Sequence, residues 1–158
     1  MSKINYVIGD ATRPQGDGLK VIVHLANDVG RWGKGFVLAL SKRWKLPEQS
    51  YREWYRDRES APMMLGMVDW TQPEKDIKVA SIIGQHGIGN KNGPPVNYDA
   101  IENGLTVVAD AVLRRKDTTV HMPRIGCGLA GGSWDKIEPI IQRQLCDRGI
   151  SVTVYDLK

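Results

Sequence analysis

The apolar and polar stretches of the chain predict strands and helices in regular alternation. Runs rich in β-branched residues and bounded by glycine or polar turn residues predict strands. These runs lie at residues 4–10, 19–26, 65–71, 77–84, 118–123 and 150–157. Apolar positions spaced three and four residues apart predict helices at residues 36–44, 47–59, 98–115 and 134–149. The first of these helices ends or is interrupted at Pro47, because proline disrupts a helix interior.

The order of these elements favours one architecture. Strands alternating with helices are typical of a three-layer α/β/α sandwich, in which helices cover both faces of a mixed, mostly parallel sheet. The run at 19–26 is largely apolar, as expected of a strand buried on both faces. Residues 1–158 have the length of one domain and contain no repeat or linker, so we expect a single domain.

Three glycine-rich loops follow predicted strands, at 27–35, 84–95 and 126–132. Ligands of such sheets bind beyond the carboxyl ends of the strands, where these loops are expected to meet. Glycine lets backbone N–H groups approach an anion, and a helix that begins after the loop adds its positive dipole end. Because the first and third loops precede predicted helices, together they predict a clamp for a diphosphate. Neither is a Walker motif, and "GCGLAG" at 126–131 lies too near the C-terminus for a Rossmann dinucleotide fold.

Four segments together resemble a macrodomain: "YVIGDAT", "VHLANDVGRWGKGFVLAL", "MPRIGCGLAGGSW" and "TVYDL". They follow one another in the right order over nearly the whole chain. Within the superfamily they are similar to the branch of the yeast ADP-ribose 1''-phosphate phosphatase and the human terminal ADP-ribose glycohydrolase. The resemblance implies ADP-ribose or a derivative as ligand, free or attached to a protein, and no metal or organic cofactor.

The resemblance also implies which residues bind the ligand. Asp10, followed by Ala11, matches the aspartate that accepts a hydrogen bond from the adenine amino group, and Asn27 is expected at the distal ribose. The other expected ligand-binding residues belong to the first and third glycine-rich loops: Trp32, Gly33, Lys34, Gly35, Gly126, Cys127, Gly128, Leu129, Ala130, Gly131 and Gly132. Two alternatives stay open: Asp10 as the cap of a turn, and Cys127 as a nucleophile rather than a small loop-filling residue.

For catalysis the resemblance points to His24 first and Asp28 second, as groups that position or deprotonate a water. The alternative for His24 is an ordinary core residue. The glycohydrolase branch has a catalytic aspartate after "GCGL" and a lysine in the middle loop, where this chain has Ala130 and Gln85 or His86. Because alanine cannot act as acid, base or nucleophile, lysine-dependent covalent chemistry is not expected.

Three activities remain open within the macrodomain resemblance, and one alternative lies outside it: a generic nucleotide-binding α/β protein that acts on RNA, which the scattered charge disfavours. The first is release of phosphate from ADP-ribose 1''-phosphate, and the second is hydrolysis of acyl or ADP-ribosyl esters. The third is recognition of ADP-ribose without catalysis.

Composition adds limits on partners. The chain has 22 Lys and Arg against 18 Asp and Glu, a net charge of +4 that suits an anionic ligand. The cations are scattered, so nucleic acid is not expected as a partner; the one aromatic and charged band, at 41–60, predicts amphipathic helices rather than a basic-aromatic surface. Two cysteines cannot complete a zinc site or set a disulfide framework. No apolar run approaches a membrane span or a signal peptide, so we expect a cytoplasmic protein.

Overall fold

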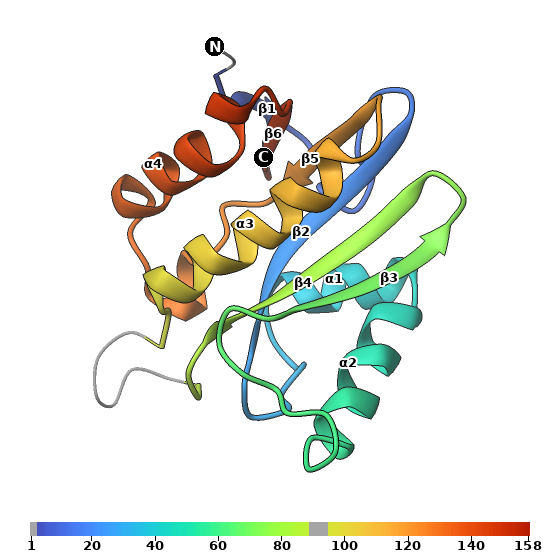
Figure 1. The fold of residues 1–158 in the computed structure, drawn as a ribbon, viewed down its shortest axis with the longest axis vertical. Helices are drawn as coiled ribbons and strands as arrows, with labels where there is room; N and C mark the ends of the chain where they lie inside the picture. The colour runs from blue at the N-terminus through green and yellow to red at the C-terminus, as the bar shows by residue number, and fades with distance from the viewer. Residues whose placement is uncertain (1–2, 89–94) are drawn as a thin grey trace.

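The computed structural model describes residues 3–88 and 95–158, and within them six strands form one sheet. The strands are β1 (Asn5–Ile8), β2 (Leu19–Asn27), β3 (Val68–Glu74), β4 (Ile77–Gln85), β5 (Thr118–Met122) and β6 (Val152–Asp156). Their order across the sheet is β1-β6-β5-β2-β4-β3 (Figure 1). β3 pairs with β4 in antiparallel orientation, and the other pairings are parallel. The predicted mixed, mostly parallel sheet is therefore confirmed.

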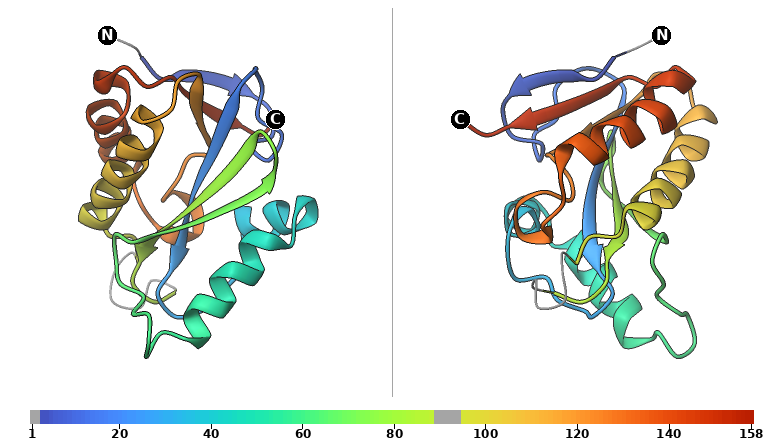
Figure 2. Two further views of the ribbon diagram at one scale, coloured as in Figure 1. Left: turned by 45° about the vertical axis from the view of Figure 1, so that its right-hand side comes forward. Right: turned by 90° about the vertical axis from the view of Figure 1, so that its left-hand side faces the viewer.

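Helices cover both faces of this sheet, as the alternation of elements predicts. α1 (Phe36–Arg43) and α2 (Leu46–Arg56) lie on one face, and α3 (Tyr98–Leu113) and α4 (Trp134–Gln144) lie on the other (Figure 2). Two short 3₁₀ turns, η1 (Gly128–Ala130) and η2 (Cys146–Arg148), flank α4. Among the described residues, no helix is long and apolar enough to cross a membrane.

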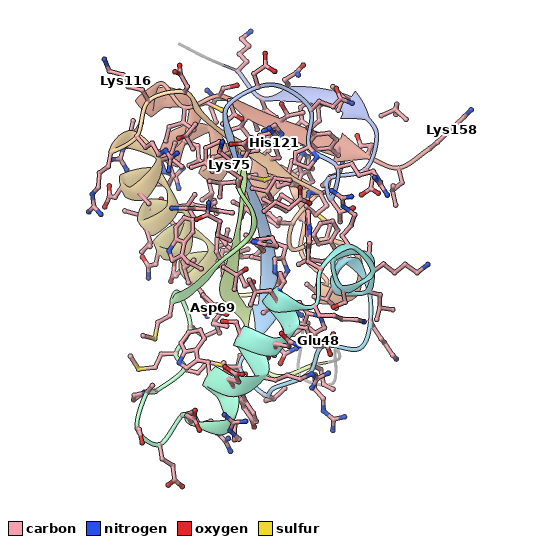
Figure 3. The ribbon with its side chains drawn as sticks, turned by 90° about the vertical axis from the view of Figure 1, so that its right-hand side faces the viewer. Glu48, Asp69, Lys75, Lys116, His121 and Lys158 are labelled. Carbon is pink, nitrogen blue, oxygen red and sulfur yellow. The ribbon has the colours of Figure 1, made fainter. Side chains whose placement is uncertain are left out.

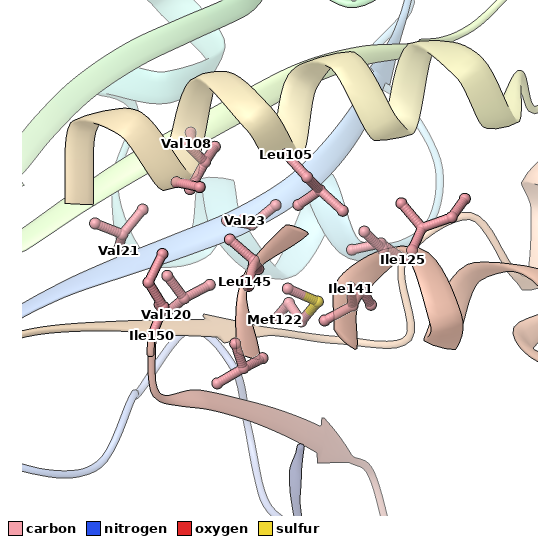
Figure 4. Packing of buried hydrophobic residues seen from close by; sticks show 14 of the residues in the cluster. Val21, Val23, Leu105, Val108, Val120, Met122, Ile125, Ile141, Leu145 and Ile150 are labelled. Carbon is pink, nitrogen blue, oxygen red and sulfur yellow. The ribbon is translucent and has the colours of Figure 1, made fainter. Parts of the chain in front are cut away.

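The core has two parts because β2 is buried on both faces. Val21 and Val23 pack with Leu105, Met122 and Ile141 beneath α3 and α4 (Figure 4). The alternate β2 residue Ile22 belongs to a second cluster on the α1 and α2 side, with Trp32, Leu40 and Tyr51 among its members. Successive strand side chains point to opposite faces, so one apolar strand supports both layers.

Several element bounds differ from the prediction for local reasons. β3 begins at Val68 and continues through Pro73, because it is an edge strand and its register shifts between Thr71 and Glu74. An edge strand tolerates proline since one side needs no ladder hydrogen bonds. The last predicted helix ends at Gln144, and η2 with the left-handed Gly149 (φ 84°) takes up the rest. Residues 89–94 of the predicted middle loop lie outside the described part of the chain.

Candidate functional site

A cavity of about 320 Å³ opens at the carboxyl ends of β2, β4 and β5. It lies where the parallel sheet is expected to receive a ligand, between the start of α1 and the loop after β5. The residues that line it are His24, Leu25, Lys34, Gly35, Phe36, Val37, Gln85, Pro123, Arg124, Ile125, Gly126, Cys127, Gly128 and Ala130. Two side chains of this set, Lys34 and Arg124, are cations and none is a carboxylate. Because Arg124 is paired with Asp156, Lys34 is the cation that favours an anion in the cavity.

The glycines after β5 divide into two kinds. Gly126 (φ 77°) has no room for a side chain, because an added Cβ would lie 2.6 Å from Ile137 Cδ1. The Gly132 N–H donates to the Gly126 carbonyl at 2.7 Å, and a Cβ on Gly132 would lie 2.3 Å from that oxygen. Gly128 (φ 67°) is different, since a Cβ there would meet nothing within 4 Å. Gly126 and Gly132 therefore serve the turn itself, whereas Gly128 leaves open space along the cavity.

The loop after β2 is shaped by the side chain of Asn27. Its Nδ2 donates to the Arg31 carbonyl at 2.8 Å, and its Oδ1 accepts from the Val29 and Arg31 N–H groups at 3.0 and 3.1 Å. The Tyr51 hydroxyl lies 2.9 Å from the same oxygen and donates to the Asn27 carbonyl at 2.6 Å. With both ends of its amide engaged, Asn27 holds the loop in place and presents the residues that follow it.

The residues that follow Asn27 in this loop include both core and surface residues. Trp32 is 3% exposed, and its Nε1–H donates to Ser41 Oγ at 2.8 Å, so it is a core residue under the loop. Gly33 is exposed with nothing within 4 Å of an added Cβ. Lys34 and Gly35 line the cavity directly before α1. The sequence predicts the location of this loop, and the structure assigns its inward and outward residues.

His24 lies in the wall of the cavity and is almost entirely enclosed. It is 1% exposed, lies against the rings of Trp32 and Phe36, and its Nε2 is 2.7 Å from Ser81 Oγ. Its Nδ1 is buried without a hydrogen-bond partner among the described residues. Burial lowers the pKa of His24 to about 4, because the charged ring cannot be solvated there. At neutral pH the ring is therefore uncharged.

Asp28 is engaged by the segment that follows β4. Its Oδ2 lies 2.7 Å from His86 Nδ1, and its Oδ1 accepts from the Gly87 N–H at 2.8 Å. The hydrogen bond to Asp28 raises the pKa of the exposed His86 imidazole. Asp28 does not line the cavity, and its carboxylate joins the ends of β2 and β4.

Asp10 and Ala11 lie away from the cavity, at the end of β1. Asp10 Oδ1 accepts hydrogen bonds from the N–H and hydroxyl of Thr12, both at 2.8 Å. This is an Asx turn, the arrangement expected of a turn-capping aspartate. The second oxygen, Oδ2, has no hydrogen bond within the described residues, so the turn leaves one acceptor available.

Arg124 is a cavity residue that the sequence interpretation did not single out. Its guanidinium binds Asp156 through Nε at 2.6 Å and Nη2 at 3.0 Å, and lies 5.1 and 5.2 Å from the ring centres of Tyr6 and Trp134. These contacts join β1, the β5 loop, α4 and β6. In the sequence, Arg124 is marked only by its place inside the segment "MPRIGCGLAGGSW". The residues that it contacts lie far away along the chain, so these contacts were not predictable from the sequence.

Cys127, which also lines the cavity, is half-buried, and burial raises the pKa of its thiol. A raised pKa keeps the thiol protonated at neutral pH and lowers its nucleophilicity. Within the described residues, no group of three or more His, Cys, Asp and Glu side chains is placed to hold a metal ion.

The chain is similar to several known proteins. No protein-family model matches the chain. A macrodomain protein from Streptomyces coelicolor is 50% identical, with a TM-score of 0.88 over 99% of this chain and 100% of that one. The chromodomain-helicase-DNA-binding protein 1-like of Mus musculus is 33% identical over 98% of this chain, but the chain spans only 18% of that protein.

More distant relatives carry names that describe ligands and reactions. The ADP-ribose glycohydrolase OARD1 of Bos taurus is 26% identical over 99% of this chain and 93% of that one. An ADP-ribose 1''-phosphate phosphatase of Candida glabrata is 23% identical over 99% of this chain and all of that protein. A mutant macrodomain of Oceanobacillus iheyensis, solved with ADP-ribose, is 20% identical with a TM-score of 0.67 over 95% of this chain and 83% of that one.

Proposed function

Because the chain belongs to the macrodomain family, we propose that it binds ADP-ribose or an ADP-ribose derivative in the 320 Å³ cavity. The observation that carries this proposal is the convergence of two glycine-rich loops on one cavity. Lys34 and Gly35 of the first loop and Gly128 of the second line the cavity. Gly128, and Gly33 directly before Lys34, have open space where a side chain would be. Lys34 supplies positive charge beside them, whereas the charge of Arg124 is balanced by Asp156. Backbone exposed in this way, with a nearby cation, is suited to a diphosphate.

Asp10 extends the proposed site along the carboxyl ends of the strands. β1 and β2 are separated by β6 and β5, so at about 4.8 Å per strand their carboxyl ends lie roughly 14 Å apart. An elongated ligand can therefore place its adenine at Asp10 and its distal ribose near the cavity. The unpartnered Oδ2 of Asp10 is the acceptor that we assign to the adenine amino group.

We further propose that the protein hydrolyses an ADP-ribose derivative, with phosphate release from ADP-ribose 1''-phosphate as the first reaction to test and ester hydrolysis as the next. His24 is the first candidate for positioning or deprotonating the water, because it reaches the cavity wall. Asp28 is the second candidate. Because its carboxylate is hydrogen-bonded to His86 and Gly87, it would have to act on the water while it still holds the segment after β4.

One observation favours a second function, recognition of free or protein-linked ADP-ribose without catalysis. No carboxylate lines the cavity, and the pKa of His24 near 4 makes its neutral ring a weak base. A binding module needs neither group to change protonation.

Titration calorimetry with ADP-ribose, followed by incubation with ADP-ribose 1''-phosphate and assay of released phosphate, separates these functions. Micromolar binding with phosphate release supports the phosphatase. Binding without release, repeated with ester-linked substrates, supports the recognition module. Absence of binding contradicts both, and the glycines then serve only the turns.

A further inference from the structure

A second cavity, of about 280 Å³, lies at the opposite end of the parallel strands. It lies on the α3 side at the amino ends of β2, β4 and β5, and its lining residues are Leu19, Val21, Trp70, Lys78, Ala111, Val112, Arg114, Arg115 and Thr118. β2 runs from this cavity toward the proposed ADP-ribose site. Its residues Leu19 and Val21 line the second cavity, His24 and Leu25 line the first, and no residue lines both. The two cavities are therefore separate sites.

Three cations from two elements line this second cavity. Lys78 comes from β4, and Arg114 and Arg115 follow the last turn of α3. Their side chains make no hydrogen bond or ion pair with other described residues, and no Asp or Glu lines the cavity. The carboxyl end of α3 contributes about half a negative charge, which three full positive charges outweigh.

The turns beside this cavity add no net charge. Lys75 and Lys116 lie toward the same end of the molecule, in the turns that enter β4 and β5 (Figure 3), and each is followed by an aspartate, Asp76 or Asp117. The positive charge of the cavity therefore comes from its three lining cations. Because these cations are scattered along the sequence, their spacing did not indicate a basic patch.

The remaining lining is suited to an aromatic ligand with a polar group. Leu19, Val21 and Val112 form an apolar wall, and Trp70 extends it from β3. In contrast, the Thr118 hydroxyl oxygen is buried and has no hydrogen-bond partner in the described chain. A buried hydroxyl is normally paired. Because the Thr118 side chain lines the cavity, rotation about its Cα–Cβ bond can turn the unpaired hydroxyl from its buried position toward a ligand.

We propose that this second cavity binds a nucleotide phosphate. The base stacks on Trp70, the phosphate lies among Lys78, Arg114 and Arg115, and the Thr118 hydroxyl donates to a phosphate oxygen. Aromatic side chains interleaved with cations are the usual means of holding a single nucleotide unit. The volume of about 280 Å³ limits the ligand to one such unit, either a free nucleotide or one residue of a single strand.

The test uses thymidine monophosphate and a ten-residue oligothymidylate, because thymine lacks the adenine amino group assigned to Asp10. In an NMR titration of the ¹⁵N-labelled protein, we expect amide shifts at Leu19, Lys78 and Thr118 and none at Gly128. Shifts with the mononucleotide identify a free nucleotide as a ligand, and shifts with the oligomer alone identify a strand. No shift at these residues with either probe overturns the proposal.

Two variants separate a built site from general attraction to positive charge. Arg114→Ala combined with Arg115→Ala is expected to weaken binding of the probe that shifts these amides at least tenfold. The control, Lys42→Ala combined with Arg56→Ala, removes the same charge from exposed positions of α1 and α2 and should change affinity less than twofold. Equal loss in both double variants overturns the proposal.

Thr118→Val tests the hydroxyl without changing the shape of the side chain. Binding is expected to fall several-fold while the thermal midpoint stays the same or rises, because the hydroxyl has no protein partner. Unchanged probe affinity would remove Thr118 from the site, and with it the observation that points to a ligand. ADP-ribose affinity should be unaffected in each variant, so failure of this site is distinguishable from failure of the first.

Discussion

His24 of β2 and Ser81 of β4 occupy paired positions in neighbouring parallel strands, with His24 Nε2 and Ser81 Oγ 2.7 Å apart. The serine fixes the orientation of a ring that is otherwise enclosed by aromatic side chains. Burial lowers the pKa of that ring to about 4, so the pair holds a neutral imidazole against the cavity wall. Any reaction that uses His24 starts from this uncharged state.

The pH dependence of turnover reports this state directly. If His24 acts as a base, kcat/KM for hydrolysis of an ADP-ribosyl ester, which has no phosphate monoester to titrate at about pH 6, is expected to stay level from pH 8 to pH 5 and fall with a midpoint near pH 4. His24→Gln should lower turnover by roughly 10²- to 10⁴-fold while ADP-ribose binding is kept. Initial rates across this pH range measure both. A midpoint near the ordinary histidine value, or full activity in the variant, would contradict the assignment.

Variants of Asp28 and of its hydrogen-bond partner His86 are compared in the same assay. Asp28→Asn keeps an acceptor for the Gly87 N–H but removes the charge that faces His86, and His86→Ala removes the other half of the same contact. If Asp28 acts by anchoring the segment after β4, both variants should reduce turnover to a similar extent. A much larger loss in Asp28→Asn alone would instead assign the carboxylate to the reaction. Single-turnover rates of the two variants make the comparison.

Asp10 has two separable roles. Asp10→Asn retains an oxygen acceptor for the Thr12 N–H and hydroxyl but loses the negative charge expected to face adenine. We expect ADP-ribose affinity to fall by about 1–3 kcal/mol, the value of a hydrogen bond to a charged group. Thr12→Val is the control, because it weakens the turn and leaves the carboxylate in place. Calorimetry should show a small change in the control, and equal losses would assign Asp10 to the turn alone.

Variants of the glycines that have open space beside them distinguish a role in ligand binding from a role in backbone conformation. Gly33→Val adds a side chain into open space at a position without a positive φ, so it should block ADP-ribose with little loss of stability. Gly128→Ala also adds backbone strain, since its φ is 67°. Gly149→Ala, at φ 84° with nothing near the added Cβ, carries a comparable strain away from the cavity. Thermal midpoints should fall alike in the two alanine variants, and binding should fall only in Gly128→Ala. Normal binding to Gly33→Val would remove the first loop from the site.

Two buried histidines make stability depend on pH. Burial lowers the pKa of both His24 and His121 to about 4, whereas the unfolded chain protonates histidine near 6.5. Below pH 6.5 the unfolded state therefore binds more protons, and the free energy of unfolding falls until about pH 4, by up to ~3 kcal/mol for each residue.

Urea denaturation at a series of pH values measures this loss. His121→Gln should remove about half of the decrease between pH 6.5 and pH 4.5. His86→Ala should leave it in place, because contact with Asp28 shifts the pKa of that exposed ring in the opposite direction. Stability that is constant over this interval would contradict the buried, neutral state of the two rings.

The sequence by itself determined the features that depend on local chain chemistry. Apolar periodicity identified the strand and helix order, and with it the sandwich. The glycines between Ile125 and Ser133 marked a turn that approaches a cavity. Residue identity also excluded a carboxylate at Ala130. These inferences hold because periodicity, turn preference and side-chain chemistry are properties of neighbouring residues.

Only the tertiary structure decided how the individual side chains are used. Trp32 is core and Gly33 is surface, although they are adjacent, because α1 and α2 pack on one side of their loop. Arg124 contacts Asp156 because β5 and β6 end side by side, and Lys78 lies near Arg114 because the end of α3 packs over the start of β4. Burial, pKa and partner all follow from which distant segments pack together, which no local pattern specifies.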